Sequence, residues 1–198
     1  MLMFWRWLLI LAAMTLPPSA AEAQERRVAL VIGNGAYRQA GALPNATNDA
    51  EDVAGVLRGL GFAVTLVRDQ EVAAMRQAIR SFGETARGAD VALFYYSGHG
   101  LQMGQRDRAE NFLVPVDARL ADARDAPAET IALSGVLDWM EGARARVVIL
   151  DACRNNPLVA RMANASGTRS IGAGLAPLDA AGAQGTLVAF ATAPGAVA

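Results

Sequence analysis

The stretch Asp90-Val-Ala-Leu-Phe-Tyr-Tyr-Ser-Gly-His-Gly100 decides the fold of this 198-residue chain. Residues 91–96 form an unbroken apolar and aromatic run, which is typical of a strand covered by helices on both faces. The run stops at Ser97, and His99, the single histidine of the chain, stands between two glycines. This pattern predicts a central strand ending at Tyr96 and a tight turn through residues 97–100. A histidine in such a turn favours a functional role over core packing.

Other apolar runs predict further extended segments at residues 28–32, 62–67, 112–116, 147–150 and 186–191. Helical spacing predicts helices between them at about residues 48–60, 75–86 and 134–140. Asn48 and Glu51 resemble a capping box, and Ser134 is a candidate cap of the third helix. Residues 102–111 are expected to form a surface loop, and residues 158–184 a long mobile loop. Alternating strands and helices predict an α/β domain with a mainly parallel sheet.

Residues 1–23 have the features of a secretory signal peptide. Arg6 supplies one positive charge, residues 7–16 are apolar, and Ala21-Glu22-Ala23 matches an A-x-A cleavage pattern. The alternative is an uncleaved membrane anchor, but the apolar run is short of the ~20 residues that span a bilayer. We therefore expect a mature domain of residues 24–198 that is periplasmic or secreted and has no stable membrane span after cleavage.

Charge and cysteine content narrow the function further. The formal net charge is −1, and no basic patch argues for a nucleic-acid partner. Cys153 is the only cysteine, so no intramolecular disulfide can form. An unpaired thiol in an exported protein is expected to be buried or used in chemistry.

His99 and Cys153 each follow a predicted parallel strand, so both are expected at the same edge of the sheet. Ligands of such sheets bind beyond the carboxyl ends of the strands, where the loops gather. Taken alone, Cys153 is more often a small buried apolar residue, and His99 could be an ordinary loop residue. A cysteine nucleophile needs a nearby base, however, and together the two residues favour catalysis.

Two motifs carry a resemblance to a known family. Ser97-Gly98-His99-Gly100 and Asp151-Ala152-Cys153-Arg154 resemble the histidine and cysteine signatures of caspase-like cysteine peptidases, especially bacterial metacaspase-like members. The agreement covers roughly residues 27–192, and it rests on the order and spacing of the motifs. It extends to Gly33, Asn34, Tyr37 and Leu43, and to Asn48-Asp49-Ala50.

The resemblance implies a caspase-hemoglobinase fold, a three-layer sandwich with helices on both faces of a mainly parallel sheet. It also implies Cys153 as the nucleophile and His99 as the general acid/base. The backbone amides of Gly100 and Cys153 would hold the oxyanion. Family members continue past the point where this chain stops, so either the catalytic domain of residues 24–198 is a fragment of a longer protein or the protein lacks part of its cleft.

The residue two places before the cysteine implies the specificity. Caspases that cut after aspartate carry Gln there, whereas metacaspases carry Asp, as this chain does at Asp151. A carboxylate in the specificity pocket would pair with Arg or Lys of a protein or peptide substrate. Ser97 is expected to be a pocket wall and Asp49 a weaker contributor. The alternative for Asp151 is a carboxylate that only caps loop amides.

Further expectations concern processing and metal. With such specificity, Arg161 and Arg169 are candidate self-cleavage sites, although arginine in a loop is more commonly just solubilising. No cofactor or metal is predicted; calcium, which metacaspases often need, could use loop oxygens of Asp107, Glu110 and Asp117, but no D-x-D-x-D-G loop is present. Two alternatives stay open: a catalytically idle module that binds a partner peptide, and a different cysteine hydrolase on an α/β sheet.

Overall fold

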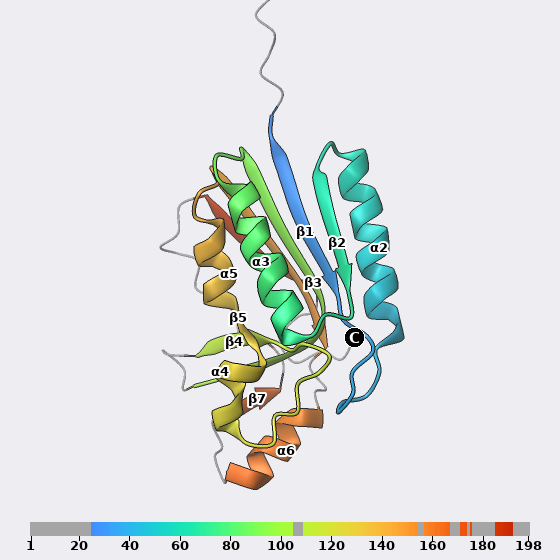
Figure 1. The fold of residues 1–198 in the computed structure, drawn as a ribbon, viewed down its shortest axis with the longest axis vertical. Coiled ribbons are helices and arrows are strands. Elements are labelled where there is room, and N and C mark those ends of the chain that lie inside the picture. The colour runs from blue at the N-terminus through green and yellow to red at the C-terminus, as the bar shows by residue number, and fades with distance from the viewer. Residues whose placement is uncertain are drawn as a thin grey trace, which may run out of the picture.

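The computed structural model describes residues 25–104, 109–153, 157–166, 171–173, 175 and 185–191, with backbone alone for Cys153, 163–166 and 171–173. The elements in chain order are β1 (Arg27–Gly33), α2 (Pro44–Gly59), β2 (Ala63–Arg68), α3 (Val72–Ala86), β3 (Val91–Met103), β4 (Glu110–Leu113), η2 (Ala123–Asp125), α4 (Ala126–Glu129), β5 (Ile131–Ala132), α5 (Leu133–Met140), β6 (Ala145–Cys153), α6 (Pro157–Ser166), β7 (Ile171–Ala173) and β8 (Thr186–Phe190) (Figure 1). The predicted signal peptide lies outside the described residues. No helix in the described part is long and apolar enough to cross a membrane.

The main sheet is parallel, as predicted. β1 lies between β2 and β3, β3 is followed by β6, and β6 pairs with β8, all in parallel. The apolar run of β3 is central and almost wholly buried, because both of its faces are covered. This accounts for the absence of an alternating pattern in residues 91–96.

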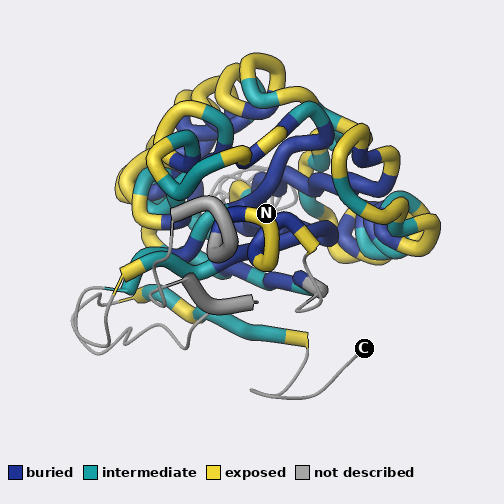
Figure 2. Tube along the Cα trace, turned by 90° about the horizontal axis from the view of Figure 1, so that it is seen from below, coloured by how far each residue is buried: buried dark blue, intermediate teal, exposed yellow. Residues whose placement is uncertain are grey.

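Successive residues of β1 belong to different layers of the domain. Val28, Leu30 and Ile32 share one apolar cluster with residues of α3 and α5. Ala29 and Val31 belong to another cluster with residues of α2. The fold is therefore the predicted three-layer sandwich, with α3 and α5 on one face and α2 on the other (Figure 1). In Figure 2 the buried strands lie between helices whose outer turns are exposed.

The prediction of a turn at residues 97–100 is wrong, because β3 continues to Met103. Up to His99 the extension pairs with β6, which itself runs on to Cys153. From Gly100 onward it pairs in antiparallel fashion with β4 and β7. These neighbouring strands supply backbone partners to Ser97-Gly98-His99-Gly100, so the glycines sit in extended chain; φ of Gly98 is 158°. Residues 102–103 and 110–111, predicted as loop, belong to β3 and β4.

The small elements below the sheet in Figure 1 correct a second prediction. Residues 158–184 are not one long loop, since they include most of α6 and all of β7. In α6, Leu158, Val159 and Met162 are buried and join an apolar cluster with Leu101 and Tyr37. Their spacing is that of a helical face, a signal hidden by the many small residues around them.

Two predicted helix caps are wrong. α2 begins at Pro44, after Leu43, so Asn48 and Glu51 lie inside the helix and form no cap. Proline suits the first turn because its missing N–H would be unpaired there anyway. Ser134 likewise lies inside α5 rather than capping it. α2 ends at Gly59, and Gly61, two residues further on, has a positive φ of 81°.

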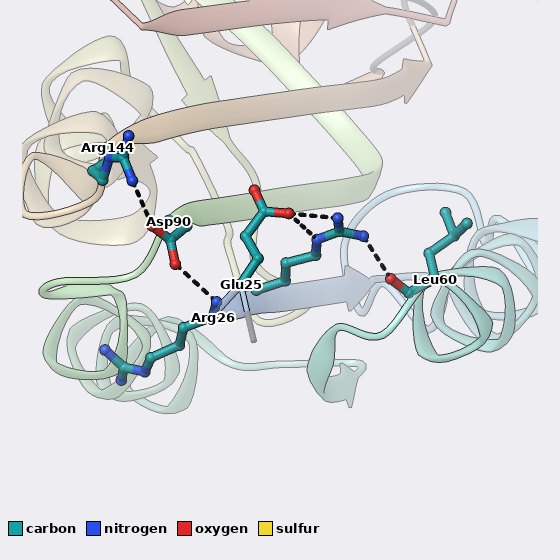
Figure 3. A network of polar contacts seen from close by, with 6 residues as sticks. Glu25, Arg26, Leu60, Asp90 and Arg144 are labelled. Atoms are coloured by element: carbon teal, nitrogen blue, oxygen red, sulfur yellow. Dashed lines mark hydrogen bonds and ion pairs between the residues drawn. The ribbon is translucent and has the colours of Figure 1, made fainter. Parts of the chain in front are cut away.

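A polar network ties together the N-terminal ends of the parallel strands (Figure 3). The Asp90 carboxylate, just before β3, accepts hydrogen bonds from the Arg26 backbone N–H and from the Arg144 guanidinium, both at 2.9 Å. The Arg26 bond first, and then that of Arg144, lower the pKa of Asp90 below its ordinary value. These residues precede β1, β3 and β6, so the network fixes how the three strands enter the sheet.

Candidate active site

His99 and Cys153 form the last register pair of the ladder between β3 and β6. Neighbouring strands lie about 4.8 Å apart, so the two backbones are direct neighbours at the carboxyl edge of the sheet. The sequence placed both residues on this edge, but beyond the strands rather than within them. The Cys153 side chain lies outside the described part of the structure.

The His99 imidazole is buried, with only 2% of the residue exposed. Its Nε2 atom lies 3.2 Å from the carbonyl oxygen of Gly41. Because a carbonyl can only accept, Nε2 carries a proton, and in the neutral ring Nδ1 is then free to act as a base. Nδ1 is buried and has no hydrogen-bond partner among the described residues. Burial lowers the pKa of His99, and the bond to Gly41 partly offsets this.

The backbone of His99 is held by two tyrosine hydroxyls. The Tyr37 hydroxyl accepts the His99 N–H at 2.7 Å, and the Tyr96 hydroxyl donates to the His99 carbonyl at 2.8 Å. The two hydroxyls lie 3.2 Å apart. A Cβ on Gly98 would come within 2.6 Å of both oxygens, which is closer than real Cβ contacts allow. The glycine before His99 is therefore required by this tyrosine pair rather than by a turn.

The loop between β1 and α2 brings Tyr37 and Gly41 over His99. Its first turn is fixed by the Asp69 carboxylate, which accepts the N–H groups of Gly35 and Ala36 at 2.8 Å. The Leu43 N–H bonds back to the Gly35 carbonyl at 2.9 Å, which closes the loop before α2 begins. The resemblance included Tyr37 without giving it a role, and nothing in the sequence singled out Gly41, which acts through its backbone carbonyl.

The predicted specificity residues form an acidic cluster on the α2 face of the sheet. Ser97 and Asp151 are register partners in β3 and β6. Tyr95 interacts electrostatically with both side chains, and Asp49 of α2 is close enough to interact with Asp151 through its charge. Burial first, and then the Asp49 charge, raise the pKa of Asp151; burial and the Asp151 charge raise the pKa of Tyr95. Tyr95 was predicted only as core, so its part in this cluster is new.

The remaining predicted residues lie elsewhere or outside the described part. Gly100 follows His99 and pairs with Leu113; a Cβ there would lie 2.8 Å from Leu175. The Glu110 carboxylate accepts the Ser134 N–H, and that of Asp117 accepts the Val72 N–H, so each binds the start of a helix. The described residues contain no group of three or more candidate metal ligands. Asp107 and Arg169 lie outside the described residues.

Arg161 lies in α6 rather than in a loop. Its guanidinium donates to the carbonyls of Arg119 and Gln39 at 3.3 and 3.2 Å. The predicted self-cleavage site is thus in a helix, and its side chain bridges two loops.

Comparison with known proteins now places the chain in a family. The family model described as the caspase domain matches residues 26–198. The chain belongs to the caspase domain family. This match, together with the parallel sheet between helices, confirms the predicted caspase-like fold.

Individual proteins similar to this caspase domain match only part of the chain. The chain is 35% identical over 92 residues to human mucosa-associated lymphoid tissue lymphoma translocation protein 1, which is 46% of this chain but only 11% of that protein. A crystal structure of a Geobacter sulfurreducens protein covers 68% of this chain, and 53% of its own length is matched, with 24% identity and a TM-score of 0.49.

Proposed function

We propose that the chain is a cysteine endopeptidase that uses Cys153 as nucleophile and His99 as general acid/base. One observation carries the proposal: His99 is the register partner of Cys153, with Nε2 on the Gly41 carbonyl and Nδ1 buried without a partner among the described residues. A buried base beside a cysteine is the arrangement that generates a thiolate.

The chemistry follows from this tautomer. Nδ1 of His99 takes the thiol proton of Cys153, and the thiolate attacks the scissile carbonyl carbon. The resulting oxyanion is held by the amides of Gly100 and Cys153. Nδ1–H then donates its proton to the leaving amine, and the acyl-enzyme forms. Water, deprotonated by His99, hydrolyses the thioester and releases the acid product, which regenerates the thiol.

Labelling with an arginyl chloromethyl ketone tests the nucleophile directly. We expect one covalent adduct, located at Cys153 by peptide mass mapping, and none in Cys153→Ala. His99→Ala should slow labelling strongly while leaving the fold intact. Binding of a basic peptide without any labelling would instead favour the idle, peptide-binding module.

The acidic cluster of Asp151, Ser97, Tyr95 and Asp49 supports cleavage after Arg or Lys. A guanidinium bound there would find the Asp151 carboxylate, with Asp49 adding negative charge nearby. Comparing fluorogenic peptides that end in Arg, Lys or Asp tests the specificity. Preference for the Asp peptide would overturn it.

Calcium dependence, self-cleavage and the signal peptide are tested separately. Titrating the peptidase activity with a calcium chelator tests calcium dependence, and we expect the chelator to leave the activity unchanged. The intact mass of the wild type against Cys153→Ala shows whether self-cleavage occurs after Arg161 or Arg169. N-terminal sequencing of the exported protein shows whether the mature chain starts at Gln24, as a signal peptide of residues 1–23 requires.

A further inference from the structure

Arg161 of α6 reaches the loop that holds His99. Its Nη2 donates to the Gln39 carbonyl at 3.2 Å, and two residues further on the Gly41 carbonyl lies 3.2 Å from Nε2 of His99. Through Nη1 the same guanidinium donates to the Arg119 carbonyl at 3.3 Å. We propose that Arg161 is a positioning residue, which fixes the Gln39–Gly41 segment and through it the orientation of the His99 imidazole.

The Gln39–Gly41 segment has few other anchors. Before it, the Arg38 N–H bonds to the Val116 carbonyl at 2.9 Å, and after it the Leu43 N–H bonds to Gly35. Between these points, the hydrogen bonds that join residues 39–42 to the rest of the described chain are those to Arg161 and His99. Gly41 also has open space where a Cβ would be. The direction of its carbonyl therefore depends on how Gln39 is held.

Packing alone would not supply this direction. Ala40 is only partly buried against the apolar cluster that includes Leu158, Val159 and Met162 of α6. Such contacts are non-directional, whereas a guanidinium offers donors in a rigid, planar arrangement. Arg161 can thus hold two carbonyls from separate loops at once, which a lysine ammonium does with less geometric control.

The position of α6 gives this contact a functional meaning. The helix starts at Pro157, four residues after Cys153, and Arg161 comes eight residues after Cys153. The element that follows the proposed nucleophile thereby also anchors the loop that orients the proposed base. The inference rests on the proposed role of His99, and it adds a residue to that function that touches neither substrate nor reacting atoms.

Arg161→Ala and Arg161→Lys test the inference, with Arg76→Ala as the matched control. Arg76 also donates from a helix to backbone carbonyls, those of Pro127, Ala128 and Thr130, but none of these residues is hydrogen-bonded to His99. We expect Arg161→Ala to lower kcat at least about tenfold, since small misplacements of a catalytic group cost up to 10²-fold. KM should stay unchanged, Arg161→Lys should restore part of kcat, and Arg76→Ala should keep both constants.

Hydrogen exchange of the peptide spanning residues 36–43 provides a readout independent of activity. We expect faster exchange in Arg161→Ala than in the wild type or Arg76→Ala. Unchanged exchange and unchanged kcat in Arg161→Ala would overturn the inference. It would also be overturned if intact mass showed cleavage of the wild type after Arg161 and only the cleaved protein were active. A wild type that cleaves no peptide contradicts the proposed function instead, and the exchange rates still decide whether Arg161 holds the loop.

Discussion

Tyr37 contacts His99 in two ways at once. The ring centroids lie 4.5 Å apart at an interplanar angle of 50°, and the Tyr37 hydroxyl accepts the His99 backbone N–H at 2.7 Å. One side chain therefore packs against the imidazole and also satisfies the buried main chain that carries it. Replacing Tyr37 by Phe removes the hydroxyl and keeps the ring, so this substitution measures the hydrogen bond apart from the ring packing.

Tyr37→Phe should destabilise the fold more than Tyr96→Phe does. The first change leaves the His99 N–H buried without its acceptor, which typically costs about 1–3 kcal/mol. The second removes a donor from the His99 carbonyl, but that oxygen still accepts the Val114 N–H at 3.0 Å. Denaturant unfolding of both variants and the wild type measures the difference. Equal losses would contradict the role given to the Tyr37 oxygen.

Gly98→Ala is expected to be strongly destabilising, because its Cβ would lie 2.6 Å from each tyrosine oxygen. Overpacking of this kind typically costs about 1–3 kcal/mol. Gly55→Ala is the control: Gly55 lies in α2, and its Cβ would have nothing within 4 Å. Alanine there should stabilise the protein by about 0.5–1 kcal/mol, since it favours the helix. Thermal unfolding that ranks Gly98→Ala level with Gly55→Ala would rule out the clash.

The sequence was sufficient to predict the layers of the fold and the shared edge of His99 and Cys153. Both depend on patterns that act over a few residues: apolar runs, helical spacing and strand-to-helix order. The length of β3 could not be predicted, since the extended path through Ser97-Gly98-His99-Gly100 depends on β4, β6 and β7 pairing with it. These residues look like a turn in the sequence because they include two glycines, but the glycines are needed here because a Cβ at Gly98 or Gly100 would clash with neighbouring side chains.

The parts of the site that the sequence did not reveal act through backbone atoms or at long range. Gly41 contributes a carbonyl oxygen, which any residue type possesses, so no motif could mark it. Arg161 seemed to lie in a loop because alanines and small polar residues surround it, yet α6 turns it toward Gln39. Tyr95 was assigned to the core. It interacts electrostatically with Asp151 only because β3 and β6 are neighbours.

Unfolding stability should rise with pH through the range in which His99 titrates. Burial lowers the pKa of His99 in the folded protein, whereas in the unfolded chain it is near its ordinary 6.5. Below that value the unfolded state binds more protons, so stability is lost as the pH falls toward the folded pKa. The raised pKa of Asp151 acts in the opposite sense above its own ordinary value of 3.8.

The comparison with His99→Gln isolates the histidine, which is the only one in the chain. Denaturant unfolding measured from pH 5 to 8, at about half-unit steps, should give a steeper rise for the wild type than for the variant. Parallel curves would contradict a His99 that is buried in its neutral form.

Asp151→Asn tests the acidic cluster as a specificity site. If the Asp151 carboxylate binds the substrate cation, its loss removes a charge-assisted hydrogen bond worth about 1.5–3 kcal/mol, or roughly a ten- to hundredfold rise in KM for Arg peptides. The turnover number should change little, because Asp151 takes no part in proton transfer. Asp49→Asn should have a smaller effect, since Asp49 interacts with Asp151 through charge alone.

Asp52→Asn is the matched control for these carboxylates. Asp52 lies in the same helix as Asp49, but its side chain is exposed to solvent. Its substitution by Asn removes the same negative charge. KM for Arg and Lys peptides, measured for all three variants, should rise in the order Asp52→Asn, Asp49→Asn, Asp151→Asn. If Asp151→Asn matches Asp52→Asn, the Asp151 carboxylate does not bind the substrate cation, and the basic residue of the substrate must be recognised elsewhere on the chain.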